Sequence, residues 1–309
     1  MIEQGKAKEF VAVLRKTLLE RATSRSRTER EVSPEIVTNR CAQLEAVFAE
    51  MDALKFDRNM SDDTFWRTAA TKPFYAGHLA SAVEARNDYM LDSYLGDRTE
   101  LNSAAWNPGR ERFEEFMDDE DCFRHADNLT TVIVAANNVT ATMRQHPDKT
   151  IIQWVCRNIE DTSDIASLKI IHKRLNDLLK FGEVTTFHLM TELGFPVVKP
   201  DRVVNRIAIQ IGLIDRYKKG DKTYILNKPV TTTRATNLGA IPEFNWALQD
   251  ACRRIADEAG ISLRLLDFMI VKLGQEPDEV NGFVRTICTE TFPTCQLCSV
   301  KPMCAHPRK

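Results

Sequence analysis

Apolar residues recur at intervals of three and four along much of this chain, which is the spacing of one face of an α-helix. Such stripes begin at Phe10 and Cys41 near the N-terminus, and again at Ile165, Phe244 and Leu263. Each stripe is long enough for several helical turns. The pattern therefore predicts an all-α protein.

Two of the predicted helices, which together cover residues 165–193, are separated by only a short break. The first ends near Leu179 and the second starts at Val184. The break contains Lys180 and Gly182, so we expect a tight turn there. Because the N-terminus of a helix exposes unpaired backbone N–H groups that suit a phosphate, these two residues are candidate contacts to nucleic acid.

Composition narrows the class of protein. The 309 residues are 43% hydrophobic and 28% charged, which excludes collagen-like and wholly disordered chains. No apolar run approaches the roughly 20 residues of a membrane span, so we expect a cytoplasmic protein that contacts no membrane. The net charge is −2, but residues 151–309 carry 22 Lys and Arg against 18 Asp and Glu, an excess of +4. This half is therefore the better place to seek an anionic partner, although an excess this small often has no function.

The eight cysteines fall into two groups. Four are scattered and are interpreted as small buried apolar side chains: Cys41, Cys122, Cys156 and Cys252. Four crowd the C-terminus with C-x6-C-x2-C-x5-C spacing: Cys288, Cys295, Cys298 and Cys304. Reduced thiols so close together favour a metal over disulfides. Structural zinc usually takes two short knuckles and only one is present, so we favour a [4Fe-4S] cluster, with zinc left open.

This cysteine tail is similar to the cluster loop of the endonuclease III and adenine-glycosylase branch of the helix-hairpin-helix DNA glycosylases. The resemblance implies two helical lobes, a helix-hairpin-helix motif and a C-terminal iron–sulfur loop. The expected boundaries are N-terminal helices over 1–59, a six-helix lobe over 60–215, an inserted loop over 216–241, and C-terminal helices with the cluster over 242–309. Residues 275–286 are expected to be an additional segment before the first cysteine.

A second similarity follows the predicted hairpin. After a Gly/Pro loop, Asp201, Val204, Arg206 and Ile207 match the family's aspartate-containing stretch, although Pro200 and Val203 depart from it. The resemblance implies that Asp201 is catalytic. Cleavage of an N-glycosidic bond develops positive charge on the sugar, and a carboxylate stabilises that charge. Asp is also a favoured residue at helix N-termini, so Asp201 is expected to cap a helix in either case.

Family members that also cut the strand carry a lysine in the second hairpin helix. The matching positions here are Glu183 and Val184, and neither can form a Schiff base. We therefore expect a monofunctional enzyme that uses water. Lys180, one turn away, leaves a lyase activity open.

Other candidate contacts depend on residue type alone. A base turned out of the duplex needs aromatic and polar neighbours. The resemblance implies a base pocket in the region of residues 64–79, which supplies such residues: Trp66, Phe74, Tyr75 and His78. Burial in a helical core is the alternative for each of them. Lys199 and Arg202, beside the aspartate, are expected to contact phosphates.

Together these features predict a monomeric DNA glycosylase that hydrolyses the bond to a damaged or modified base. Its partner would be double-stranded DNA, and in the cell it would associate with the nucleoid. The alternatives are an inactive DNA-binding protein with hairpin and cluster, a bifunctional glycosylase and lyase, and a zinc-bearing scaffold. The sequence does not identify the base.

Overall fold

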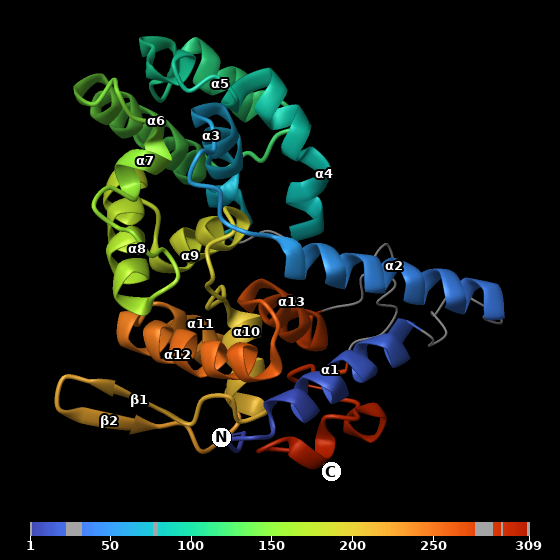
Figure 1. Cartoon of the computed structure of the whole chain (residues 1–309). Helices are drawn as coiled ribbons and strands as arrows, with labels where there is room; N and C mark the ends of the chain where they lie inside the picture. Colours follow the sequence, from blue (N-terminus) through green and yellow to red (C-terminus); the bar gives the residue numbers. More distant parts are fainter. Residues whose placement is uncertain (1, 23–32, 77–79, 276–286, 292, 308–309) are drawn as a thin grey trace. The chain divides into compact units, whose positions relative to one another are not determined.

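The computed structural model describes residues 2–22, 33–76, 80–275, 287–291 and 293–307 (Figure 1). Thirteen α-helices and one two-stranded sheet account for most of these described residues, which confirms the predicted helical class. In the same part of the chain, no helix is both long and apolar enough to cross a bilayer.

The chain forms two compact units. The first contains residues 1–54 and 196–309, and the second contains residues 55–195. The first unit is therefore built from both ends of the chain. Its elements are α1 (Ala7–Ala22), α2 (Pro34–Ala53), α10 (Arg202–Gln210), β1 (Arg216–Lys219), β2 (Lys222–Ile225), α11 (Thr232–Gly239), α12 (Pro242–Ala259), α13 (Leu263–Gly274) and the short 3-10 helices η5 (Cys295–Leu297) and η6 (Lys301–Met303).

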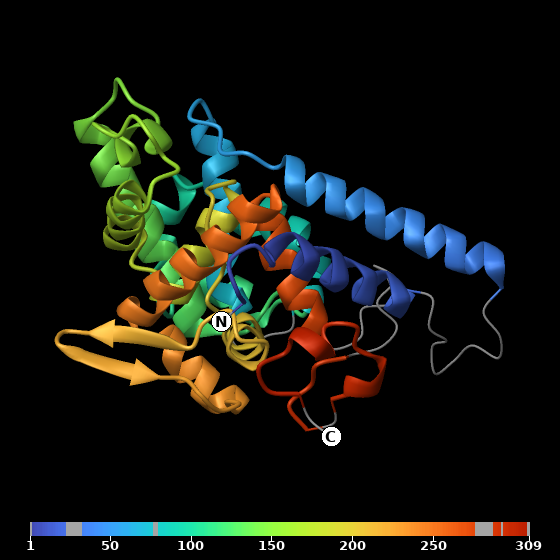
Figure 2. The same ribbon diagram turned by 60° about the horizontal axis from the view of Figure 1, so that its bottom comes forward.

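Helix α1 packs against α2, α12 and α13, and α10 packs against α11 and α13 (Figures 1 and 2). The stripe predicted for α1, which includes Phe10, Leu14 and Leu18, is fully buried. It meets buried side chains of α10 and α12, among them Ile207 and Phe244, in one hydrophobic core. Apolar burial of this kind is the main stabilising contribution to the unit.

The expected inserted loop over 216–241 is wrong. Residues 216–225 form an antiparallel hairpin in which Tyr217 pairs and stacks with Tyr224, with ring centroids 5.0 Å apart. Tyr217 also meets Phe244 edge-on at 5.7 Å. Further along, Thr231 caps α11, whose Leu238 is buried. The many polar residues of this segment indicated a loop, but the cross-strand tyrosine pair stabilises a two-stranded ribbon against α12.

The position of Asp201 also differs from the expected boundaries. The lobe expected over 60–215 would contain it, but the second unit ends at Phe195 and Asp201 belongs to the first. The reason is that the segment just before Asp201 is hydrogen-bonded to α12, which belongs to the first unit. Gln249 of α12 accepts from the N–H of Val198 and donates to its carbonyl, both at 2.8 Å.

In the described residues of the second unit, all regular secondary structure is helical. Its elements are α3 (Asp62–Ala70), η1 (Lys72–Tyr75), α4 (Ala80–Met90), the π-helical turn η2 (Leu91–Leu95), η3 (Glu100–Asn102), η4 (Ala104–Trp106), α5 (Glu111–Asp118), α6 (Ala126–Gln145), α7 (Ile151–Val155), α8 (Ile165–Leu179) and α9 (Glu183–Glu192). Helix α6 packs against α8, and α9 packs against α8 and η1. Helices α8 and α9 are the two that the sequence predicted on either side of a tight turn.

The two ends of the second unit lie against each other. Phe56 stacks on Phe195 with ring centroids 3.9 Å apart. Beside this pair, Gly194 has a φ of +81°, and a Cβ there would lie 2.5 Å from the backbone carbon of Lys55. Only glycine fits this position, because both the dihedral angle and the close approach exclude a side chain.

Candidate functional site

Asp201 lies at the N-terminus of α10, where one of its carboxylate oxygens caps the helix. Its Oδ1 accepts from the N–H groups of Val203 and Val204, at 2.8 and 2.9 Å. Its Oδ2 lies 3.7 Å from Nζ of Lys199, and 22% of each side chain is exposed. The cap therefore fixes the carboxylate through Oδ1, while Oδ2 lies outside the cap and faces the Lys199 ammonium.

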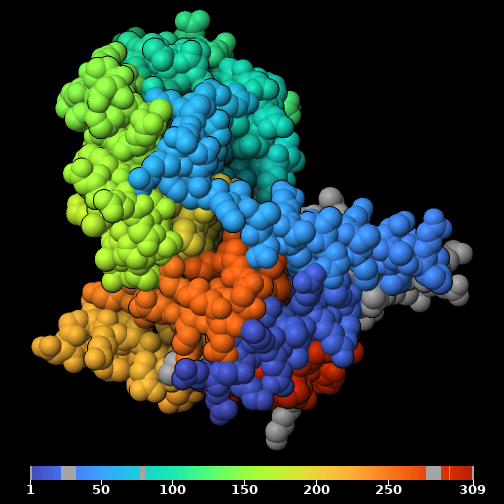
Figure 3. Space-filling view, viewed as in Figure 1, coloured from blue at the N-terminus to red at the C-terminus, as the bar shows by residue number. Residues whose placement is uncertain are grey.

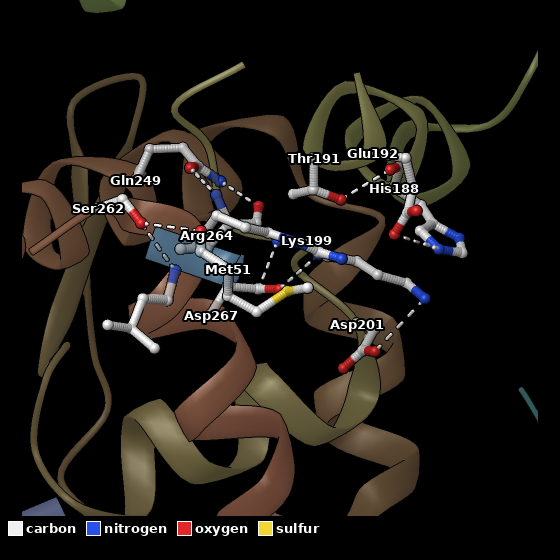
Figure 4. A network of polar contacts seen from close by, with 12 residues as sticks. Met51, His188, Thr191, Glu192, Lys199, Asp201, Gln249, Ser262, Arg264 and Asp267 are labelled. Atoms are coloured by element: carbon white, nitrogen blue, oxygen red, sulfur yellow. Dashed lines mark hydrogen bonds and ion pairs between the residues drawn. The ribbon is translucent and has the colours of Figure 1, made fainter. Parts of the chain in front are cut away.

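The segment before Asp201 is held by buried polar side chains. The carboxylate of Asp267, on α13, accepts from the N–H of Lys199 at 2.9 Å, and its other oxygen lies 3.5 Å from Nη1 of Arg264 (Figure 4). Burial raises the pKa of Asp267 to about 6, with a smaller upward contribution from Asp201; Arg264 and the Lys199 N–H act in the opposite direction.

Asp267 and Gln249 were missed in the sequence, although a signal was present for Asp267. This aspartate stands four residues after Leu263 and three before Ile270, on the apolar stripe of α13. A carboxylate on a buried helical face must have partners there, because an unpaired buried charge is costly. Gln249 stands next to Leu248 in a similar stripe of α12 and gave no comparable signal.

The four C-terminal cysteines all line one pocket. The rest of its lining is mainly apolar and includes Ile211, Leu273 and Val300. Burial raises the pKa of the Cys288 thiol to about 12 and raises those of Cys298 and Cys304 as well. Four soft sulfur donors on the walls of one pocket fit a thiolate-bound metal group, whose charge would reverse this effect of burial.

A single ion needs its ligands to converge on one point. Among the described residues, no group of three or more His, Cys, Asp or Glu side chains is close enough to do so. The four cysteines nevertheless line the same pocket, from Cys288, the η5 turn with Cys295 and Cys298, and Cys304.

Helix α10 also holds the cysteine loop. The guanidinium of Arg206 donates to the carbonyl of Cys288 at 2.7 Å and to that of Gly274 at 3.0 Å. At the end of the helix, the carbonyl of Gln210 accepts from Sγ of Cys304 at 3.2 Å and from the N–H of His306 at 3.1 Å. One nine-residue helix thus carries Asp201 at its N-terminus and the cysteine loop at its C-terminus.

In the second unit, the turn between α8 and α9 consists of residues 180–182. Lys180 ends α8 with a left-handed φ of 58°, and Gly182 begins α9 without a side-chain cap. Both residues are exposed. The first N–H groups of α9 therefore face the turn, where a helix terminus favours an anion.

Glu183, in the first turn of α9, is directed to the buried His172, with Oε2 and Nε2 3.6 Å apart. Burial lowers the pKa of His172 to about 4, so this contact is not an ion pair at neutral pH. Neither Glu183 nor Val184 carries an amine, so the position that holds the lyase lysine in the resembled family remains without one.

Two of the four expected base-pocket residues are corrected by the structure. Trp66 is 2% exposed, and its Nε1 donates to the carbonyl of Leu95 at 2.8 Å. Phe74 is fully buried, with its ring 5.7 Å from that of Phe116. Both are core residues of the second unit, because the aromatic stripe of α3 and η1 faces inward.

Tyr75 keeps part of its side chain at the surface. Its ring meets His188 edge-on at 4.6 Å, and Nζ of Lys72 lies 5.0 Å from the ring centroid. Burial and the charges of Glu84 and Glu192 raise the pKa of its hydroxyl, which therefore stays a hydrogen-bond donor at neutral pH. His78 lies outside the described residues, as do residues 276–286 of the expected additional segment.

Of the expected phosphate contacts beside the aspartate, Lys199 is partly buried against Asp201 and Arg202 is exposed.

No protein-family model, no curated protein and no solved structure matches this chain. The functional conclusion therefore depends on the arrangement of these residues and on the motifs in the sequence.

Proposed function

We propose that this protein is a DNA glycosylase that hydrolyses the N-glycosidic bond of a damaged or modified base turned out of the duplex. The observation that carries the proposal is the position of Asp201. Its Oδ1 is fixed by two backbone N–H groups, while Oδ2 lies outside the cap, and the same helix contacts the cysteine loop. The aspartate and the cysteine loop, the two parts of the resemblance, are thus both in contact with α10.

The proposed chemistry is charge stabilisation. As the bond between the base and C1′ breaks, the electron pair leaves with the base and C1′ becomes cationic. The carboxylate of Asp201 stabilises this cation, and a water adds to C1′ to give an abasic site. The water supplies the oxygen on C1′, and one proton ends on the departed base.

The four cysteines are proposed as ligands of a [4Fe-4S] cluster: Cys288, Cys295, Cys298 and Cys304. When bound, the cluster would hold the C-terminal loop in a fixed shape. It would supply no electrons for the hydrolysis. The turn at Lys180 and Gly182 is proposed as a phosphate contact, since its exposed residues begin a helix without a side-chain cap.

The iron can be tested apart from activity. Replacing Cys295 by Ala is expected to remove the brown colour and most of the bound iron and sulfide from the purified protein. Replacing the buried Cys252 of α12, which lies away from the pocket lining, by Ala should leave both unchanged. Equal metal contents in the two variants, or zinc in place of iron in the wild-type protein, would refute the cluster.

The activity is tested with duplexes that each contain one altered base: an alkylated purine, an oxidised pyrimidine or a mispair. Base release is measured, and strand breaks are counted with and without alkali. The proposal predicts release of at least one base and strand breaks only after alkali. A DNA-binding protein without catalysis would bind these duplexes and release nothing.

A second candidate function, strand cleavage by a lysine, is favoured by one distance. Nζ of Lys199 lies 3.7 Å from the carboxylate of Asp201, so an amine is present at the proposed reaction centre. Borohydride would trap a Schiff base between that amine and the sugar as a covalent adduct. A wild-type adduct that is lost in Lys199→Gln but kept in Lys180→Gln would establish this function and exclude the monofunctional mechanism.

A further inference from the structure

The β1–β2 hairpin is a basic ribbon in a slightly acidic protein. Residues 215–228 contain five Lys or Arg and two Asp, a local charge of +3, whereas the whole chain has a net charge of −2. The ribbon extends away from α12 in both views of the first unit (Figures 1 and 2). In the space-filling view its surface projects beyond that of α12 (Figure 3).

Three lysines near the tip of this ribbon outnumber the one carboxylate there, Asp221, which lies in the turn between Lys219 and Lys222. Lys218, Lys219 and Lys222 are exposed, and none of them forms an ion pair with another described residue. In contrast, Arg216 is paired with Asp215 through two contacts of 3.0 Å. The ribbon therefore presents three cations that this unit leaves to solvent.

Apolar side chains accompany these cations at the surface. Ile225 is 52% exposed and Tyr224 is 41% exposed, which is unusual for residues of their size in this chain. Ile225 pairs across the ribbon with Arg216, so the two share one face, beside Lys218. Interleaved basic and apolar side chains suit a partner with both charge and flat apolar edges, as nucleic acids have.

The root of the ribbon is fixed. The N–H of Leu226 donates to the carbonyl of Asp215 at 2.6 Å and closes the base of the hairpin. Tyr217 stacks inside it and contacts Phe244 of α12. The tip lysines are therefore carried on a positioned element rather than on a flexible loop, which lowers the entropy that binding must overcome.

We propose that the β1–β2 ribbon is a second duplex-DNA contact, in which Lys218, Lys219 and Lys222 neutralise backbone phosphates. The inference rests on the proposed function, because it takes DNA as the partner. A two-stranded ribbon fits the major groove of B-form DNA, and phosphate contacts of this kind position a protein without reading sequence. An acidic protein is the competing partner for the same charges.

The test measures binding of a lesion-free duplex to the full chain by fluorescence anisotropy at several salt concentrations. The triple variant Lys218→Ala, Lys219→Ala, Lys222→Ala is compared with a control of equal charge change, Lys6→Ala, Lys8→Ala, Lys16→Ala, which alters exposed lysines on and before α1 of the same unit. The ribbon variant is expected to bind at least about tenfold more weakly at low salt and to lose about 2 to 3 from the slope of log K against log salt. The control should keep the wild-type slope.

The outcomes separate the two proposals. If the wild-type chain binds no duplex, DNA is the wrong partner and the proposed function fails together with the ribbon contact. If wild type binds and the ribbon variant keeps the same affinity and slope, only the ribbon contact is refuted, as it would be for a ribbon that binds an acidic protein. An equal loss in both triple variants would mean that net charge alone acts, which also refutes a specific contact.

Discussion

Gly274, at the end of α13, sets how closely that helix approaches α10. A Cβ there would lie 2.5 Å from Cγ1 and 2.6 Å from Cδ1 of the buried Ile207. Gly274→Ala is therefore expected to lower the free energy of unfolding by about 1 to 3 kcal/mol through overpacking. Urea unfolding measures this loss. Gly182→Ala, whose Cβ would meet nothing within 4 Å, is the control; it causes no overpacking, and Ala as a poorer N-cap than Gly should cost at most about 1 kcal/mol.

Asp267 is expected to make stability depend on pH. Burial raises its pKa from 3.8 to about 6 in the folded protein, so the folded state binds the proton more tightly than the unfolded state. The stabilisation is complete below about pH 4 and is lost as the pH rises to about 6, a change of about 3 kcal/mol.

The matched variant is Asp267→Asn, which keeps an oxygen to accept from the N–H of Lys199. Its free energy of unfolding, measured in urea between about pH 4 and pH 7, should fall less with rising pH than that of the wild-type protein. Parallel curves for the two proteins would mean that Asp267 does not titrate in this range.

Single residues were predictable where a motif and a local rule agreed. Asp201 was expected both as a catalytic group and as a helix cap, and the structure confirms the cap. The tyrosine pair of the ribbon was not recognised, because two aromatic positions seven residues apart leave no periodic signal. The inward direction of Trp66 depends on which face of α3 the rest of the unit covers, and no local pattern contains that information.

At the scale of elements, α3 and η1 belong to the core of the second unit. Trp66→Ala is expected to cost about 3 to 5 kcal/mol, because it leaves a cavity and an unpaired carbonyl at Leu95. Thermal and urea unfolding would show it. Tyr75→Phe, which keeps the ring against His188, should remain within about 1 kcal/mol of wild type. A Trp66→Ala protein of normal stability would restore the base-pocket interpretation.

The helices themselves were predictable from apolar spacing and from caps. Asp164 caps α8 by accepting from the N–H groups of Ala166 and Ser167, within the run of capping residues that the sequence offered. The turn after α8 was predicted from Gly182, but its left-handed residue is Lys180, whereas Gly182 has an extended backbone. The ribbon over 216–225 was not predictable, since its stability comes from Phe244 on a helix that follows it in the chain.

At the scale of the whole molecule, the limits of the two units were the hardest feature to predict. The boundary falls between Phe195, which stacks on Phe56, and Val198, which is bound by Gln249. Each of these contacts joins residues at least 50 positions apart in the chain, so no window of sequence contains both partners. Asp201 and the cysteine loop consequently belong to the same unit. The proposed chemistry requires a fixed carboxylate, and contacts within this unit hold Asp201 in place.

The most direct test of the account is the rate of base release by Asp201→Asn in a single turnover, on a duplex that the wild-type protein processes. Asn is as good a helix cap as Asp, so the fold and the affinity for DNA should be kept. The account predicts that release slows by about a hundredfold or more, because the neutral amide cannot stabilise the cationic sugar. Release at the wild-type rate by a folded, DNA-binding Asp201→Asn protein would contradict it.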